Sequence, residues 1–252
     1  MTDDQETTGA GDTFISHLVE LRNRVMKASL AILVVFLCLM PWAGNIYDWL
    51  ALPMMSALPT GSKMIATGVI TPFLVPVKVT LLVAFLIALP VVLYQAWAFI
   101  APGLYTHEKK LIAPLVISSS ILFIVGVAFC YFFVFGVIFK FINEFAPKSI
   151  AVAPDIESYF GFVMTLFIAF GMTFEVPIVV IVLVRMGLVT VQKLKEIRPY
   201  VIVGAFVIAA VVTPPDILSQ LLLALPLCLL YEVGLIVAPI FARATQAPEE
   251  TA

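Results

Sequence analysis

Three carboxylates stand out in a chain that has few charged side chains. Glu20 lies near the start of the chain, four residues before Arg24, and Glu108 lies in a polar segment between two long apolar runs. Glu175 lies inside an apolar run, ten residues before the next charge at Arg185. A surface ion pair with Arg24 would explain Glu20 without any function, because residues four apart are neighbours on a helix. For Glu175 a packing role is likewise open, as a protonated or hydrogen-bonded carboxyl.

The motifs of common enzyme classes are absent from the sequence. It contains no GxxxxGK[ST] phosphate loop and no HExxH, GxSxG or CxxC pattern. The only histidines, His17 and His107, lie in different segments with no obvious nucleophile beside them. We therefore expect no enzymatic activity, no metal and no cofactor, and the lack of a basic stripe argues against nucleic acid as a partner. The three cysteines lie inside apolar runs and are expected to be packing residues: Cys38, Cys130 and Cys228.

The composition indicates that the solvent of this chain is lipid. Hydrophobic residues make up 62% of the 252 residues, charged residues 12%, and the mean hydropathy is +1.12. Soluble domains are roughly 45–50% apolar and about 25% charged. A soluble fold of this size cannot bury so much apolar surface, so the sequence predicts an all-α membrane protein. The polar, acidic start of the chain predicts that it has no cleavable signal peptide.

Six apolar stretches are long enough, or nearly so, to cross a bilayer. A hydrocarbon core of about 30 Å needs roughly 20 residues of helix. The predicted spans cover residues 26–44, 72–100, 111–139, 159–184, 199–212 and 217–241. The segment 45–71, which we predict to be a loop, has no counterpart between the last two spans. An inverted repeat of the kind found in secondary transporters is therefore poorly supported.

Lysine and arginine residues predict the orientation of the chain. With a cytoplasmic N-terminus, ten of the fourteen basic residues lie on the cytoplasmic side, as the positive-inside rule requires. Both termini are then cytoplasmic. The predicted organisation is a segment 1–25 with an amphipathic helix at the membrane surface, a six-helix domain over residues 26–241, and a tail over residues 242–252.

Two predicted spans are unusually short, and another contains a proline. The fifth has 14 residues, which is about 21 Å of helix. The sixth reaches its first charge, Glu232, after a similarly short run. Beside both helices we expect a thinned membrane or deeply placed polar groups. Pro90 lies inside the second span, where it removes a backbone hydrogen bond and should kink the helix.

A recognisable pattern is distributed along the chain in seven short segments: residues 16–24, 94–110, 170–177, 198–200, 213–220, 224–227 and 230–232. They follow one another from residue 16 to residue 232 and so cover nearly the whole chain. Together they resemble the TatC family, the multi-spanning subunit of the twin-arginine protein translocase. The resemblance implies six transmembrane helices in a concave, cup-like bundle in the bacterial inner membrane.

The resemblance also implies a function. TatC-like proteins bind signal peptides with two consecutive arginines at the cytoplasmic face, and help to export folded proteins using the proton-motive force. The peptide-binding positions that it implies here are Glu20, Glu108, Arg22 and Phe99. The chemistry fits, because a carboxylate can bind a guanidinium through two parallel hydrogen bonds, a geometry that lysine cannot reproduce.

The partners that the resemblance implies are single-span subunits of the TatA and TatB type, membrane lipid, and further copies of the chain in a multimeric complex. Polar positions assigned to contacts within the membrane are Glu175, Gln220, Thr213 and Asp216. Pro53 and Pro90 are assigned structural roles. Phe99 and Pro53 can also be interpreted as packing and loop geometry.

The competing hypothesis is a secondary transporter or channel for a small solute, with Glu175 as its proton or cation site. A carboxyl about 15 Å inside a span is expensive and is a functional hypothesis by default. The hypothesis is disfavoured because the charges are too few for a relay and no repeat is visible. The sequence instead predicts that Glu175 faces a concave, partly hydrated cavity.

Overall fold

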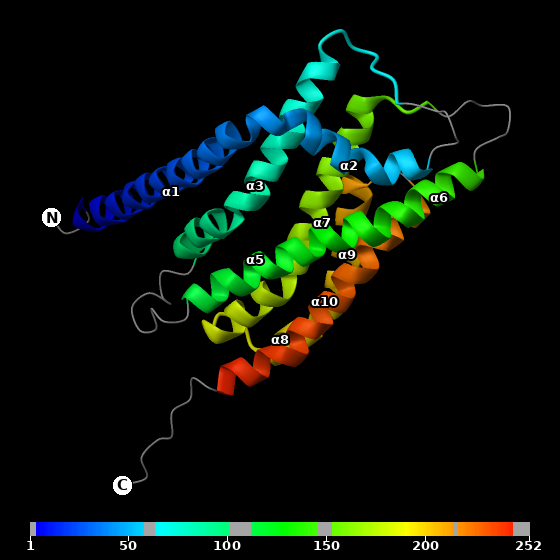
Figure 1. The fold of residues 1–252 in the computed structure, drawn as a ribbon. Coiled ribbons are helices and arrows are strands. Elements are labelled where there is room, and N and C mark those ends of the chain that lie inside the picture. Colours follow the sequence, from blue (N-terminus) through cyan, green and yellow to red (C-terminus); the bar gives the residue numbers. More distant parts are fainter. Residues whose placement is uncertain (1–3, 58–63, 101–111, 146–152, 214–215, 244–252) are drawn as a thin grey trace.

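The computed structural model describes residues 4–57, 64–100, 112–145, 153–213 and 216–243. Within these residues the chain is almost entirely helical, which confirms the predicted all-α class (Figure 1). The elements in chain order are α1 (Asp4–Leu39), the 3₁₀ turn η1 (Met40–Trp42), α2 (Ala43–Ala57), α3 (Thr71–Ile100), α5 (Ile112–Phe129), the π-helical turn η3 (Cys130–Val134), α6 (Phe135–Phe145), α7 (Ile156–Arg185), α8 (Val191–Glu196), α9 (Arg198–Val212) and α10 (Ile217–Arg243).

Five helical stretches of the described residues are long and apolar enough to cross a membrane. They are Ile15–Pro53, Thr71–Ile100, Ile112–Ile142, Ile156–Arg185 and Ile217–Ile240. These stretches coincide with the predicted first, second, third, fourth and sixth spans. The predicted fifth span is the apolar helix α9, which has 15 residues. Its predicted shortness is confirmed, since 15 residues extend over only about 22 Å.

The segment 45–71 is not the loop that the sequence predicts, because its first part forms helix α2. This helix ends at Ala57 and includes Pro53. Leu50 and Ala51 are buried in the core, so apolar packing favours the helix. Pro53 has no N–H to donate to the carbonyl four residues earlier. That carbonyl, of Trp49, instead accepts a hydrogen bond from the Tyr131 hydroxyl at 3.1 Å.

The sixth span is not short, and the prediction that it would be is wrong. Helix α10 has 27 residues and continues through Glu232. Glu232 is tolerated within the helix because it is paired: Arg198 Nη2 of α9 donates to Glu232 Oε2 at 2.6 Å. Nearby, the Tyr231 hydroxyl donates to the Leu194 carbonyl of α8 at 2.8 Å. These two contacts hold α8, α9 and α10 together.

Helix α1 joins the predicted amphipathic segment and the first span in one uninterrupted helix. It lies along α3 (Figure 1). None of its most apolar 18-residue window is buried by the described residues. Cys38 on this helix is exposed, contrary to the packing role that the sequence predicts. Cys130 is buried as expected, and Cys228 is partly buried.

Helix α7 is the central element and packs against α10, α5 and α3. The core around it is rich in aromatic side chains, of which Phe135, Phe160 and Phe170 are fully buried. The ring of Phe135 stacks on that of Phe167 with centroids 5.5 Å apart. The turn η3 continues the third span and keeps Cys130 and Val134 in the same core.

Helices α5 and α7 approach each other closely at Gly126. A Cβ at this position would lie 2.6 Å from the backbone oxygen of Phe170 and 2.9 Å from the ring of Phe174. Only glycine avoids this collision, so Gly126 sets the distance between the two helices. Gly136 on α6 has nothing within 4 Å of the corresponding position.

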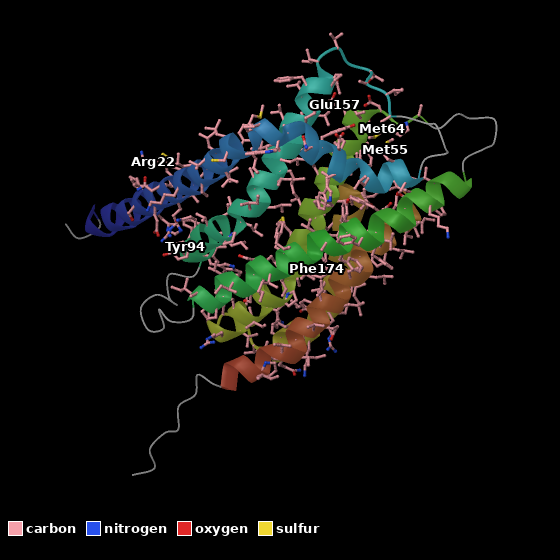
Figure 2. All side chains as sticks on the ribbon, viewed as in Figure 1. Arg22, Met55, Met64, Tyr94, Glu157 and Phe174 are labelled. Atoms are coloured by element: carbon pink, nitrogen blue, oxygen red, sulfur yellow. The ribbon has the colours of Figure 1, made fainter. Side chains whose placement is uncertain are left out.

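The two ends of the bundle carry different residues (Figure 2). Arg22 and Tyr94 lie at one end, and Met64 and Glu157 lie at the other. At the Glu157 end, the segment 64–70 is tied to the start of α7: Thr67 donates from its backbone N–H and its hydroxyl to Asp155 Oδ1, at 3.2 and 2.8 Å. Lys78 Nζ pairs with Glu157 Oε1 at 2.8 Å.

Asp155 is also the N-cap of α7, where its Oδ2 accepts from the Ser158 backbone N–H at 3.0 Å. Hydrogen bonds to the charged carboxylate lower the pKa of Asp155 to about 2. The bond from the Ser158 backbone has the largest effect, and the bond from the Thr67 hydroxyl has the next largest. The unfolded carboxyl has a pKa of about 3.9. Because Asp155 has a lower pKa in the folded protein, its carboxylate stabilises the fold fully when the pH is above the pKa of the unfolded state. This stabilisation is lost as the pH falls through the pKa of the folded state.

Gly126→Ala should destabilise the bundle by about 1–3 kcal/mol, the usual range for overpacking, because the methyl group collides with a backbone oxygen. Gly136→Ala is the matched control and should be neutral or stabilising, since alanine is the better helix former. Thermal unfolding in detergent compares them. Equal midpoints for the two variants would contradict the close approach at Gly126.

Asp155→Ala should release Thr67 at neutral pH, and acid should do the same to the unsubstituted protein, while the backbone hydrogen bonds of Ile65 to Pro154 and Ile156 remain. Hydrogen exchange of the Thr67 amide is compared between the two proteins at each pH. We expect strong protection of the unsubstituted protein above pH 4 that converges on the variant as pH falls towards 2. A difference that persists unchanged below pH 2 would contradict the role of the Asp155 carboxylate.

Candidate functional site

Glu20 lies on α1 and is engaged by an arginine of the same helix. Arg24 donates to Glu20 Oε1 from Nε at 2.8 Å and from Nη2 at 2.5 Å. The second oxygen, Oε2, lies 4.0 Å from His17 Nδ1, beyond hydrogen-bonding distance. The carboxylate remains 44% exposed, so a ligand can reach it. The ion pair predicted from the spacing is confirmed.

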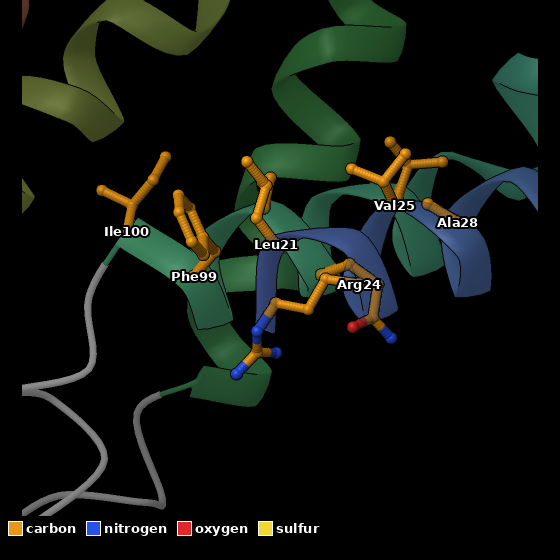
Figure 3. A pocket seen from close by; sticks show the side chains of 9 residues that line it. Leu21, Arg24, Val25, Ala28, Phe99 and Ile100 are labelled. Carbon is orange, nitrogen blue, oxygen red and sulfur yellow. The ribbon is translucent and has the colours of Figure 1, made fainter. Parts of the chain in front are cut away.

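An apolar groove lies beside this carboxylate, between α1 and α3 (Figure 3). Its volume is about 250 Å³, and its lining is apolar except for two side chains: Leu21, Arg24, Val25, Ala28, Val92, Gln95, Ala96, Phe99 and Ile100. In Figure 3 the side chains of Leu21, Val25 and Phe99 lie on one side, and the Arg24 guanidinium extends to the other. The groove therefore combines an apolar wall with a charged edge.

Phe99 links α3 to α1 at this groove. Its ring stacks on the imidazole of His17 with centroids 4.4 Å apart and an interplanar angle of 20°. Arg22 lies on α1 close by in sequence but is exposed, and donates to the Asn23 side chain at 3.4 Å. Glu108 lies outside the described residues. The structure thus brings Glu20 and Phe99 to one surface.

Glu175 lies at the contact between three helices. The Ser119 hydroxyl of α5 donates to Glu175 Oε2 at 2.7 Å, and Trp97 Nε1 of α3 donates to Ser119 Oγ at 3.0 Å. An indole N–H can only donate, whereas a hydroxyl both accepts and donates. The chain of hydrogen bonds therefore runs in one direction, from Trp97 through Ser119 to the carboxyl. The hydrogen-bonded interpretation of Glu175 has direct support.

The other oxygen, Glu175 Oε1, is buried and has no hydrogen-bond partner among the described residues. A second cavity of about 450 Å³ lies between α7, α9 and α10 and is lined in part by Met172, Thr173 and Val176. Glu175 is not among its lining residues and is directed towards Ser119 instead. The hydrated cavity expected around Glu175 therefore stays a prediction.

The remaining polar positions make local contacts near the junction of α9 and α10. The Thr213 hydroxyl donates to the Ala209 carbonyl at 2.8 Å at the end of α9. Asp216 Oδ1 accepts from the Ser219 backbone N–H at 2.7 Å, as an N-cap of α10 does. Gln220 Nε2 donates to the Phe206 carbonyl at 3.2 Å and so connects the two helices.

The sequence did not predict the partners of four polar side chains, which form hydrogen bonds or an ion pair between helices: Trp97, Ser119, Arg198 and Glu232. Each pair joins residues far apart in the chain, by 56 positions for Ser119 and Glu175 and by 34 for Arg198 and Glu232. The only available signal was that polar side chains are rare in these apolar helices. Pro90 is exposed within α3, and the kink predicted there stays a prediction.

Comparison with known proteins places these features in context. Residues 16–226 match the family model described as TatC, Sec-independent protein translocase protein. The chain is 53% identical to TatC of Halothiobacillus neapolitanus, over 96% of this chain and 66% of that protein. It is 51% identical to TatC of Haemophilus influenzae, over 89% of this chain and 88% of that protein. With TatC of Escherichia coli K12 the identity is 50%, over 87% and 85%.

A solved structure with the same fold is described as the crystal structure of the twin arginine translocase receptor TatC. It superposes with a TM-score of 0.78 at 38% sequence identity and covers 90% of this chain and 100% of that one. The resemblance inferred from the short segments is confirmed by this match, by the relatives and by the family model. Since the family model spans residues 16–226 and several relatives share about half of their residues with it, the chain belongs to the TatC family of Sec-independent protein translocase proteins.

Proposed function

We propose that this chain is a core subunit of a twin-arginine translocase and binds twin-arginine signal peptides at its Glu20 end. The observation that carries the proposal is the exposed Glu20 carboxylate beside the apolar groove that Phe99 lines. Signal peptides combine a positively charged segment with an apolar one. A carboxylate next to an apolar groove complements both parts.

Glu108 is the second carboxylate of the proposed recognition surface, so that each arginine of the peptide has its own partner. A guanidinium presents a planar fork of N–H donors that matches the two oxygens of a carboxylate. Arg22 and Phe99 complete the surface. Arg22 is exposed on α1, and Phe99 supplies an aromatic wall beside the carboxylate.

The proposed arrangement has six crossings, both termini in the cytoplasm of a bacterial cell, and a concave bundle in the inner membrane. It comprises the segment 1–25, the membrane domain 26–241 and the tail 242–252. The distribution of basic residues supports this orientation. The short helix α9, with its 15 residues, supports a locally thinned membrane.

TatA- and TatB-type subunits are the proposed partners within the membrane, together with further copies of the chain. The polar residues offered to them are Glu175, Gln220, Thr213 and Asp216. Glu175 supports this best, because its Oε1 is buried without a partner among the described residues. Folded cargo would cross the membrane with energy from the proton-motive force. The alternative of a small-solute transporter gains no support, since the relatives are protein translocase components.

Glu20→Gln and Glu108→Gln should each weaken the binding of a synthetic twin-arginine peptide. Losing one charge-assisted pair should cost about 1.5–3 kcal/mol, which is roughly ten- to 150-fold in affinity. Glu196→Gln is the control, because Glu196 is an exposed carboxylate that pairs with Lys193 on α8. Binding is measured in detergent by fluorescence anisotropy. Unchanged affinity in the Glu20→Gln, Glu108→Gln double variant would refute the proposal.

Glu175→Gln should abolish most transport while leaving peptide binding and folding intact. Glutamine keeps a side-chain oxygen that can accept from Ser119 but removes the charge offered to a partner. Glu175→Ala should block transport to the same degree. Glu157→Gln controls for the loss of a carboxylate from α7. Export of a folded reporter into inverted vesicles is the measurement. Normal export by Glu175→Gln together with unfolding of Glu175→Ala would show that the residue serves packing alone.

A further inference from the structure

The carboxylate proposed to bind a ligand arginine already holds an arginine of its own helix. Both hydrogen bonds from Arg24 fall on one oxygen, Glu20 Oε1, at 2.8 and 2.5 Å. The Arg24 side chain is 24% exposed, less than the 44% of its partner. Arg24 also lines the groove, with its guanidinium directed away from the side chains of Leu21 and Phe99 (Figure 3). Arg24 therefore holds the carboxylate that a peptide arginine would use, at the edge of the groove.

Arg22 provides an internal comparison. It carries the same charge on the same helix, two residues earlier, and so projects from a different face. Its guanidinium is exposed and donates to the neighbouring Asn23 side chain at 3.4 Å. An ion pair between residues four apart on an exposed helix is a weak contributor to stability. The small contribution of the Arg24–Glu20 pair to stability therefore does not explain why Arg24 lies at the groove.

We propose that Arg24 is a built-in competitor for the ligand arginine. It occupies Glu20 in the unbound protein, leaves when a peptide guanidinium arrives, and so sets a threshold affinity for the site. This inference rests on the proposed function, since it takes Glu20 as a peptide-binding carboxylate.

The geometry of the two oxygens requires the exchange. A guanidinium that binds as a fork uses both carboxylate oxygens. Oε1 is taken by Arg24, while Oε2 has His17 Nδ1 only at 4.0 Å. An incoming arginine can therefore form its second hydrogen bond only after Arg24 moves. A lysine, as a point charge, gains less from the same exchange.

The exchange makes binding a difference between two ion pairs. For an arginine ligand, one pair within the protein is broken and one with the ligand is formed, so the competitor lowers its affinity. A lysine can reach Oε2 without displacing Arg24, so its affinity should depend less on the competitor. Weakly bound arginine peptides are the ones that the threshold removes.

The test compares Arg24→Gln with Lys27→Gln in the full chain, using synthetic peptides with two arginines or two lysines. Lys27 is exposed on α1, one turn from Arg24. Both variants remove one positive charge near the site and so favour cationic peptides in general. Arg24→Gln should raise the affinity for the two-arginine peptide further, by about two- to fivefold over Lys27→Gln, the equivalent of a partly exposed ion pair. The two-lysine peptide should gain less, because it needs only one carboxylate oxygen.

Arg24→Lys provides a second variant in which the net charge stays constant. Lysine cannot reproduce the two hydrogen bonds of Arg24, so the affinity should rise above that of the unsubstituted protein, whereas Lys27→Arg should leave it unchanged. In a Glu20→Gln background, Arg24→Gln should add no more than Lys27→Gln does, because the carboxylate for which the two arginines compete is gone.

Two results would overturn the inference while leaving the proposed function intact. An affinity that falls in Arg24→Gln would mean that Arg24 holds Glu20 in place for the ligand. An increase no larger than that of Lys27→Gln would mean that only general charge matters. The proposed function itself fails in a different way, if the unsubstituted protein binds both peptides equally or Glu20→Gln has no effect.

Discussion

The bilayer offers no hydrogen-bonding partners, and this constraint decides how the polar side chains of the apolar helices are used. A polar group in hydrocarbon must find its partner inside the protein. Ser119 and Trp97 satisfy one oxygen of Glu175, Arg198 satisfies Glu232, and the Gln220 side chain bonds to the backbone of α9. Each of these contacts joins different helices. The few polar groups therefore also specify which helices are neighbours.

Local patterns in the sequence were sufficient for the helices but not for the contacts between them. The helical class, the position of most spans and the Glu20–Arg24 pair follow from composition and from spacing within one helix. The length of α10 does not, because Glu232 ends the apolar run unless its distant partner Arg198 is known. Helix α2 was missed because Pro53 and polar neighbours resemble a loop. Its burial against α3 and α6 depends on the assembled bundle.

Helix α3 separates the two candidate sites and touches both. Phe99 stacks on His17 of α1, while Trp97 donates to Ser119 beside Glu175. Residues two apart on a helix project in nearly opposite directions, about 200° from each other. One turn of α3 thus forms the wall of the peptide groove on one side and supports the intramembrane carboxyl on the other.

The π-helical turn η3 gives the third span a place where one residue can be lost without a change of register. A π turn holds one residue more than the regular spiral around it, so the helix after it is rotated by about 100° relative to a regular continuation. Phe135 and Phe139 lie in the core only because of this offset. Loss of a single codon within residues 130–134 would remove the extra residue and restore a regular helix with both rings still facing the core. In genetic terms, a one-residue deletion is better tolerated here than in the regular parts of the span, where it would rotate the following residues by about 100°.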